Sequence, residues 1–399
     1  MEEVYIYDCA RTARGRVRGE LHEVAPHELL ATVLRALPER TGLDPGEVTD
    51  LLVGCVTPVG DQGGNVAQAA LAAAAWPAAV AGVQVNRSGA SGLEAVHGAA
   101  ARIAAGYDEL LVAGGVEGVS RVPLGADGGP LLTDPELLLA SGTVPRGVAA
   151  DLIASDLGFD RDAVDAYAVE SQRRCAAAVA GGRFARSLVP VNDGNGIVLL
   201  ARDSHPRPDT DAEALARLPA AFAKTGALGF DALALSRYPA VARIDHVHTA
   251  GNSSGPADGA AAVVLGSAAA GERLGLAPRA RLRAVAVASS EATMMLLGLL
   301  PATERALARA GLACGDVELF EVDEAFAAVP LAFLRHFGLD HARVNVNGGA
   351  IALGHPVGAT GAILLGTLVD ELERRGDGLG VATLGAGGGQ GIAAVVERV

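Results

Sequence analysis

Two stretches of the chain carry the same succession of helical and strand-like patterns. Near the N-terminus, a helical pattern over residues 29–39 leads through a Gly-Leu turn to a short apolar strand at 50–56. An Ala- and Leu-rich helix at 93–105 and a strand at 109–113 follow. Near the C-terminus the succession returns at 303–310, 317–322, 362–374 and 380–384. Helices alternating with strands of this length predict α/β layers with a mostly parallel sheet.

Short sequence matches support a duplication of these two stretches. Gly42-Leu43 corresponds to Gly311-Leu312, and the motif at 89–92 corresponds to the motif at 358–361 with the same separation along the chain. We therefore predict α/β domains at residues 1–120 and 272–399. Residues 121–271 contain Pro-rich and polar loops and a strong helix at 161–180. They are interpreted as an insertion that covers a site between the two halves.

Composition and charge exclude several classes of protein. Half of the 399 residues are hydrophobic and 20% are charged, so a large core can be buried. The net charge of −14 argues against a nucleic-acid partner. Lys224 is the one lysine in the sequence, which argues against a Schiff-base enzyme.

The cysteines, the histidines and the N-terminus give no sign of a metal, a disulfide or a membrane. Four scattered cysteines without CxxC spacing indicate reduced core thiols. His246 and His248 alternate on an expected strand without an evident third ligand, so we expect no metal. The acidic N-terminus lacks a signal-peptide pattern, and the longest apolar run, 69–83, is shorter than the roughly 20 residues of a membrane span. These features predict a soluble, cytoplasmic protein.

Glycine-rich motifs suggest a specific family. Residues 345–356 read NVNGGAIALGHP and residues 387–391 read GGGQG; such loops either present N–H groups to a ligand or pack helices closely on strands. Together with RT at 11–12, GGVE at 114–117, TAGNSSG at 249–255, DGAA at 258–261 and EAFA at 324–327, they resemble the thiolase family over the whole chain. The resemblance implies the five-layered αβαβα thiolase fold, a coenzyme A thioester as substrate, no permanently bound cofactor, and a homodimer or a homotetramer built as a dimer of dimers.

The resemblance also shows where this chain departs from the family. Gly89 stands where thiolases have the nucleophilic cysteine, and Gly385 stands where they have the second, acid/base cysteine. Asp323 replaces the asparagine of the family's Asn-Glu-Ala-Phe motif, whereas His355 is kept. An acyl-cysteine mechanism is therefore not expected.

Other parts of the family's site are retained. The resemblance places the backbone N–H groups of Gly89 and Gly387 in an oxyanion hole, and Ser254, Ala325 and Phe326 beside the coenzyme A arm. Near His355, an ionised Asp323 would favour the imidazolium form or orient a water as a base. Ser88 is a weaker candidate nucleophile, one position from Gly89 and expected to point elsewhere.

Three functions are compatible with this pattern. The first is Claisen-type carbon–carbon bond formation or cleavage (acyl transfer) on acyl-CoA thioesters without a cysteine acyl-enzyme. The second is hydrolysis of a thioester or a β-keto compound by water activated by Asp323 and His355. The third is a non-catalytic acyl-CoA-binding subunit of another enzyme. The acyl carrier is either coenzyme A or a carrier-protein arm.

Overall fold

Two β-sheets, one from each half of the chain, meet along one edge. The computed structural model describes residues 2–399; Met1, the first residue of the acidic N-terminus, lies outside the described residues. The strands of the first sheet are β4 (Ala81–Val85), β3 (Asp50–Gly54), β5 (Leu110–Gly118), β9 (Ala257–Gly266) and β1 (Val4–Thr12), in spatial order. The strands of the second are β10 (Ala280–Ser289), β13 (Gln390–Arg398), β12 (Leu379–Gly385) and β11 (Leu319–Val322). A short antiparallel pairing of β1 with β10 joins them.

The two sheets repeat one topology, but they are not mostly parallel as predicted. The order β3-β5-β9-β1 of the first sheet matches β11-β12-β13-β10 of the second. β3, β4 and β5 run parallel, as do β11 and β12. β9 runs antiparallel to β5 and β1, and β13 runs antiparallel to β12 and β10. The sequence pattern misses this because burial on both faces makes antiparallel core strands as apolar as parallel ones.

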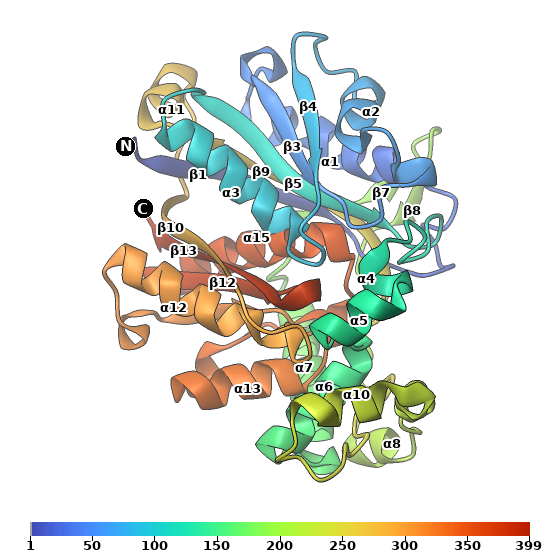
Figure 1. Ribbon diagram of the computed structural model, residues 1–399. Coiled ribbons are helices and arrows are strands. Elements are labelled where there is room, and N and C mark those ends of the chain that lie inside the picture. Colours follow the sequence, from blue (N-terminus) through green and yellow to red (C-terminus); the bar gives the residue numbers. More distant parts are fainter. Residues whose placement is uncertain (1) are drawn as a thin grey trace.

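Helices cover the outer faces of the sheets and fill the space between them, which gives five layers (Figure 1). The first sheet is covered by α1 (Pro26–Thr41) and α2 (Val66–Ala73), and the second by α12 (Leu299–Ala310). The central layer consists of α3 (Ser91–Ala104) and α15 (Val357–Arg375), which pack against each other. This is the predicted thiolase fold.

The two repeated glycine motifs meet where α3 and α15 begin. A Cβ atom at Gly92 would lie 2.6 Å from the carbonyl oxygen of Gly358, and one at Gly361 would lie 2.5 Å from the backbone nitrogen of Leu93. Only glycine allows the helices to approach this closely. The N-terminal ends of both central helices are thereby held side by side, next to the ends of strands β3 and β12.

Most helices of the segment between the repeats form a lobe beside the second sheet, at the lower right of Figure 1, whereas its short strands lie near the first sheet. α6 (Arg146–Leu157) and α7 (Arg161–Ala180) pack on α13 (Ala328–Phe337), and α7 also packs on α14 (Ala350–Leu353). The smaller elements of this segment are α4 (Pro130–Thr133), α5 (Pro135–Ser141), α8 (Ala212–Ala216), α9 (Ala223–Thr225), α10 (Asp231–Arg237), β6 (Leu188–Val189), β7 (Val191–Asn192) and β8 (Val198–Leu200).

The end of the predicted insertion joins the first sheet. β9 lies at 257–266, within the predicted range 121–271, and pairs with both β1 and β5. α11 (Ala268–Leu274) follows it and contacts β1. We therefore propose that the first α/β domain resumes at about β9, so that the lobe alone forms the insertion.

One helical stretch has the length and apolar character of a membrane span. It covers Pro135–Leu157, and 61% of its most apolar window is buried inside the protein. Residues 142–145 interrupt it, so it forms the separate helices α5 and α6. Most of α6 is buried, whereas α5 has no buried residue, and neither helix alone is long enough to cross a membrane.

Candidate active site

Four loops bring the predicted catalytic residues together at the ends of the central helices. Gly89 lies just before α3, and His355 lies just before α15. Asp323 follows β11, and Gly385 ends β12. The carboxyl ends of β11 and β12 and the N-terminal ends of α3 and α15 meet here, which is where open α/β sheets bind ligands.

His355 is held firmly and keeps one ring nitrogen free. It is 7% exposed, and its backbone N–H donates to the carbonyl oxygen of Gly255 at 2.9 Å. Its Nδ1 lies 2.8 Å from Oγ1 of Thr360, a residue in the first turn of α15. Nε2 has no partner among residues 2–399 and is therefore the atom left to meet a substrate.

Asp323 and His355 are neighbours, but the structure does not favour the imidazolium ion that we expected. The two side chains approach to 3.7 Å between Asp323 Oδ1 and His355 Nδ1, and that oxygen is buried without a hydrogen-bond partner among the described residues. Burial raises the pKa of Asp323 to about 7. Burial, and after it the positive charges of Arg146 and Arg14, lower the pKa of His355 to about 3. The expectation about the imidazolium was wrong because desolvation outweighs the attraction between the two groups.

The two positions where thiolases have cysteines differ in the space around them. A Cβ atom at Gly89 would meet nothing closer than 3.5 Å, namely a methyl group of Val357. A Cβ atom at Gly385 would lie 2.2 Å from the carbonyl oxygen of Leu296, in the short helix η4 (Met295–Gly298). Position 89 can hold a side chain, whereas backbone already fills the space beside position 385.

The predicted oxyanion-hole residues lie on loops that face each other. The Cβ position of Gly89 is 3.7 Å from the carbonyl oxygen of Gly385, and that of Gly387 is 3.3 Å from Oγ of Ser88. Gly387 begins the short turn η7 (Gly387–Gly389), and its N–H makes no backbone hydrogen bond among residues 2–399. The role of these N–H groups stays a prediction.

Ser88 lies closer to the site than its sequence position suggested. It adopts a left-handed φ of 47°, and its Oγ packs beside Gly387. Its N–H donates to Oδ1 of Asn86, and its carbonyl oxygen accepts from Oγ of Ser91. Within residues 2–399, no histidine or carboxylate makes a hydrogen bond to the Ser88 hydroxyl, so no general base is in place for it.

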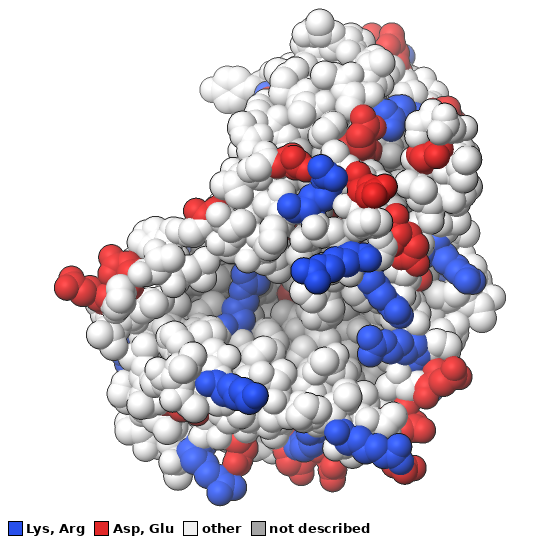
Figure 2. Space-filling view, turned by 90° about the vertical axis from the view of Figure 1, so that its right-hand side faces the viewer, with Lys and Arg blue, Asp and Glu red and all other residues white. Residues whose placement is uncertain are grey.

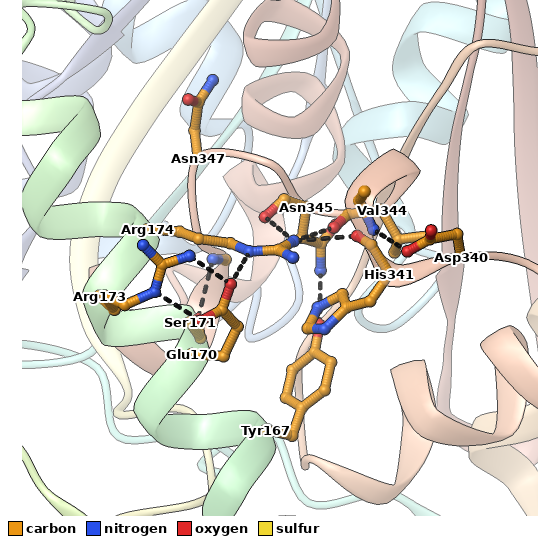
Figure 3. A network of polar contacts seen from close by, with 12 residues as sticks. Tyr167, Glu170, Ser171, Arg173, Arg174, Asp340, His341, Val344, Asn345 and Asn347 are labelled. Carbon is orange, nitrogen blue, oxygen red and sulfur yellow. Dashed lines mark hydrogen bonds and ion pairs between the residues drawn. The ribbon is translucent and has the colours of Figure 1, made fainter.

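Most of the glycine-rich segment at 345–356 supports packing rather than ligand binding. A Cβ atom at Gly348 would lie 2.5 Å from a backbone oxygen of Ser171, and one at Gly349 would lie 2.3 Å from the carboxyl carbon of Glu324. Figure 3 shows how α7 anchors this segment: Arg174 donates to the carbonyl oxygens of His341 and Val344 at 3.0 and 2.7 Å. This packing fixes the chain that leads to His355.

The carboxylate next to Asp323 is used for this anchoring. Glu324 accepts hydrogen bonds from Tyr167 at 2.9 Å, from Ser171 at 2.8 Å and from the Asn345 amide at 2.8 Å. The backbone N–H of Ile351 is a fourth donor, at 3.2 Å. Glu324 is therefore structural, and the web that it forms positions both Asp323 and the loop before His355.

The residues predicted to contact coenzyme A lie along a path that leads to His355. The N–H and Oγ of Ser254 both donate to the carbonyl oxygen of Ala325, at 3.0 and 3.2 Å, and Ser253 forms a β-bridge with Phe326. A surface pocket of about 430 Å³ lies beside the loop that precedes Ser254. Two of its lining residues, Leu215 and Leu218, pack against Gly251, and its other lining residues are Arg207, Asp209, Thr210 and Ala214.

A charged residue that the sequence did not reveal lies at this site. Arg146 is the first residue of α6, and its charge acts on both Asp323 and His355. No motif includes it, because α6 is far from the glycine loops in sequence. Only the fold of the insertion brings it here.

All four cysteines were predicted to be core thiols, and three of them are. Cys9, Cys55 and Cys175 are buried, and Cys314 is half-buried. Burial raises the pKa of Cys175 to about 12 and raises those of Cys9 and Cys55 as well, so these thiols are not activated.

His246 and His248 are not on a strand, and both bind a carboxylate. Their Nδ1 atoms lie 2.7 Å from the two oxygens of Asp151. Within residues 2–399 there is no cluster of three or more His, Cys, Asp or Glu side chains that could hold a metal ion. The pair therefore joins the 249–255 loop to α6.

Family models match both halves of the chain. The model described as "Thiolase, N-terminal domain" matches residues 4–269, and "Thiolase, C-terminal domain" matches residues 276–398. This chain belongs to the thiolase family. The β-ketoadipyl-CoA thiolase of Pseudomonas aeruginosa is 40% identical over 100% of this chain and 99% of its own length. The acetyl-CoA acetyltransferase of Escherichia coli is 38% identical over the whole of both chains.

A solved thiolase-family structure confirms the fold. The crystal structure of the Bacillus anthracis acetyl-CoA acetyltransferase superposes with a TM-score of 0.87 at 33% identity, covering 100% of this chain and 99% of that one. The family and the fold inferred from the motifs are thereby confirmed. The framework around Gly89, Gly385 and Asp323 is thus that of the thiolase family.

Proposed function

We propose that this thiolase-family chain is an acyltransferase that acts on acyl-CoA thioesters without a cysteine acyl-enzyme. One observation carries the proposal. Glycine stands at both positions where the resemblance expects a cysteine, and His355 and Asp323 lie next to each other at the same site. Relatives along the whole chain are named for acetyl-CoA, 3-ketoacyl-CoA and β-ketoadipyl-CoA, which supports a coenzyme A thioester as substrate. No permanently bound cofactor is required for this chemistry.

Asp323 is assigned as the base. With a pKa of about 7, it is partly ionised near neutrality, and its ionised form can take the proton from the carbon next to a thioester carbonyl. Neutral His355 presents Nε2 to the same thioester. The side chain of the second cysteine, which does this work in the resembled mechanism, has no room at position 385.

The carbon–carbon step then needs two thioesters in the site at once. The carbanion formed by loss of the α-proton attacks the carbonyl carbon of the second thioester, and the carbon–sulfur bond of that thioester breaks. The departing coenzyme A thiolate takes the proton that Asp323 holds. Cleavage is the same sequence in reverse, with coenzyme A thiolate attacking the keto carbon.

The glycine positions give room and stabilisation for this direct transfer. A Cβ atom at Gly89 would meet only ordinary contacts, and the second acyl group is assigned to this side of the site, where an acyl-cysteine would otherwise stand. The N–H groups of Gly89 and Gly387 are assigned to the tetrahedral oxyanion; such donors are worth about 3–4 kcal/mol each in acyl transfer.

Coenzyme A is assigned to the path from the 430 Å³ pocket through Ser254 to His355. The side of the molecule shown in Figure 2 is hollowed, and basic side chains gather around the hollow. Such a distribution attracts a phosphate-bearing ligand in spite of the net charge of −14.

The test is product analysis by mass spectrometry. The purified protein is mixed with acetyl-CoA, acetoacetyl-CoA and longer acyl-CoAs, singly and in pairs, before and after iodoacetamide treatment. We expect new or cleaved carbon–carbon products that resist iodoacetamide and that fall roughly 10²–10⁴-fold in His355→Ala and Asp323→Asn, as for loss of a general acid or base.

Matched controls and alternative outcomes make this experiment decisive. His336→Ala and Asp245→Asn alter residues on the surface and should keep full turnover. Products that form equally well in His355→Ala would overturn the assigned roles. Oxygen from labelled water in the released acid would indicate hydrolysis instead, and no turnover with retained coenzyme A binding would indicate a non-catalytic subunit.

A further inference from the structure

Arg146 is a charged side chain at the site that has no hydrogen-bond or ion-pair partner among residues 2–399. It is half-buried. Burial lowers its pKa, and the carboxylates of Asp323 and Glu117 act on it only from a distance. Partial burial of a cation without a partner is unfavourable, so this guanidinium group is a candidate to bind a ligand.

Other buried arginines of this chain show how such groups are normally satisfied. Arg11 donates two hydrogen bonds to the Asp203 carboxylate, at 2.8 and 2.9 Å. Arg279 donates to Asp370 at 2.6 Å and to Glu373 at 2.5 Å. Arg146 is less buried than these two residues and lacks a carboxylate partner. Arg14, which is buried too, donates from its guanidinium group only to the carbonyl oxygen of Gly354.

The surroundings of Arg146 place it in the wall of the site. Arg146 begins α6, and α6 packs against η4, the short helix that contains Leu296, and against α13. Three acid/base groups from three other segments sense its charge: Asp323 after β11, His355 before α15 and Glu117 on β5.

Asp323 does not serve as the missing partner. The two groups are not in ion-pair contact, and Oδ1 of Asp323 is itself without a hydrogen bond among the described residues. Glu117 is occupied elsewhere, because it accepts from Gln62 at 2.8 Å and from the N–H of Gly358 at 3.0 Å. No carboxylate of residues 2–399 pairs with the guanidinium group, which is therefore available to a bound molecule.

We propose that Arg146 binds a free carboxylate carried by the acyl part of the thioester, so that the site selects acyl-CoA substrates of a dicarboxylic acid. A guanidinium group matches a carboxylate with two parallel hydrogen bonds, which fixes the orientation of the acyl chain. The inference rests on the proposed function only in placing the thioester between His355 and Asp323, and it is tested by binding rather than by turnover.

The experiment compares two thioesters of equal chain length by isothermal titration calorimetry. Succinyl-CoA carries the terminal carboxylate, butyryl-CoA lacks it, and free coenzyme A reports the remainder of the ligand. We expect the wild-type protein to bind succinyl-CoA about tenfold or more tightly than butyryl-CoA, as for a charge-assisted hydrogen bond. In Arg146→Met this preference should vanish, while the affinity for free coenzyme A stays the same.

Further variants separate a specific role from a structural one. Arg146→Met removes an unpartnered charge and should therefore fold, which the melting temperature checks. Arg146→Lys keeps the charge but cannot form two parallel hydrogen bonds to a carboxylate, so it should retain part of the preference for succinyl-CoA. Arg243→Met removes an exposed arginine of the same insertion and should change nothing.

The outcomes either support or overturn the proposal. Equal affinity of the wild-type protein for both thioesters would overturn it. Equal losses for succinyl-CoA, butyryl-CoA and free coenzyme A in Arg146→Met would assign the arginine to a coenzyme A phosphate and also overturn it. A carboxylate preference in a protein that forms no products would leave this inference standing while the proposed function fails.

Discussion

The site has a packed side and an open side. Residues that are adjacent in sequence, such as Asp323 and Glu324, lie on different sides. On the packed side, Glu324 satisfies four donors and Gly385 is pressed against the backbone of Leu296. On the open side, Asp323 keeps an oxygen without a partner among the described residues, and a Cβ atom at Gly89 would meet only ordinary contacts, at 3.5 Å and beyond. The comparison teaches that burial alone does not separate structural from functional groups; the state of their hydrogen bonds does.

The largest effect that tests this contrast is expected at Glu324. Glu324→Ala leaves the donors of Tyr167, Ser171, Asn345 and Ile351 unpaired in the interior, which should lower the free energy of unfolding by about 3 kcal/mol or more. Asp323→Ala removes a carboxyl group with an unpaired oxygen, so it should lower the free energy of unfolding far less. Urea denaturation of both variants measures the difference, and equal losses would abolish the distinction.

The two glycines provide a second test of the same contrast. Gly385→Ala must displace a carbonyl oxygen 2.2 Å away, so we expect a loss of roughly 1–3 kcal/mol, as in overpacked cores. Gly89→Ala should change the free energy of unfolding by less than about 1 kcal/mol, because its new methyl group meets only ordinary contacts. Thermal unfolding of the two variants measures these losses. A larger loss of stability at position 89 than at position 385 would contradict the geometry.

A chemical variant sharpens the result at position 89. Gly89→Cys places a thiol in the open space and should become acylated by acetyl-CoA, visible as a mass increase of the intact protein. The wild-type protein treated in the same way should remain unmodified. Acylation of the wild-type chain would point to one of its own cysteines or to Ser88.

The raised pKa of Asp323 predicts a pH-dependent stability. The folded protein holds this proton up to about pH 7, whereas the unfolded chain releases it near its ordinary pKa of about 3.9, so wild-type stability falls as the pH rises between these values. An amide side chain at this position has no such proton to release. The variant Asp323→Asn should therefore gain stability relative to wild type from pH 4 to pH 8, by an order of 1–4 kcal/mol. A constant difference between the two proteins over this range would contradict the raised pKa.

The smallest expected effect is a shift of the pH–rate profile. If ionised Asp323 is the base, turnover rises with pH through a midpoint of about 7 and not through that of His355, which is already neutral there. Arg146 stabilises the carboxylate, so Arg146→Met should move the midpoint to higher pH. Initial rates across pH 5.5–9 measure this shift, with Arg243→Met as the control. A midpoint that moves to lower pH in Arg146→Met would contradict the proposed effect of Arg146 on the Asp323 carboxylate.

Local patterns in the sequence predicted much of this molecule. The helix at 161–180 has the predicted bounds, and the repeated succession of helices and strands is present in both halves. The glycine motifs led to the correct family because they mark places where backbone must approach backbone, as Gly92 does with Gly358. The absence of cysteine at positions 89 and 385 is likewise a property of the sequence alone.

Only the tertiary structure decided which of these residues are free to act. The antiparallel direction of β9 and β13, the blocked space beside Gly385 and the arrival of Arg146 at the site all depend on segments distant in sequence. The same holds for the charge states, because burial overrides the attraction between Asp323 and His355. Periodicity and glycine act over a few residues and can be read along the chain, whereas desolvation and the pairing of buried polar groups depend on every segment that packs around them.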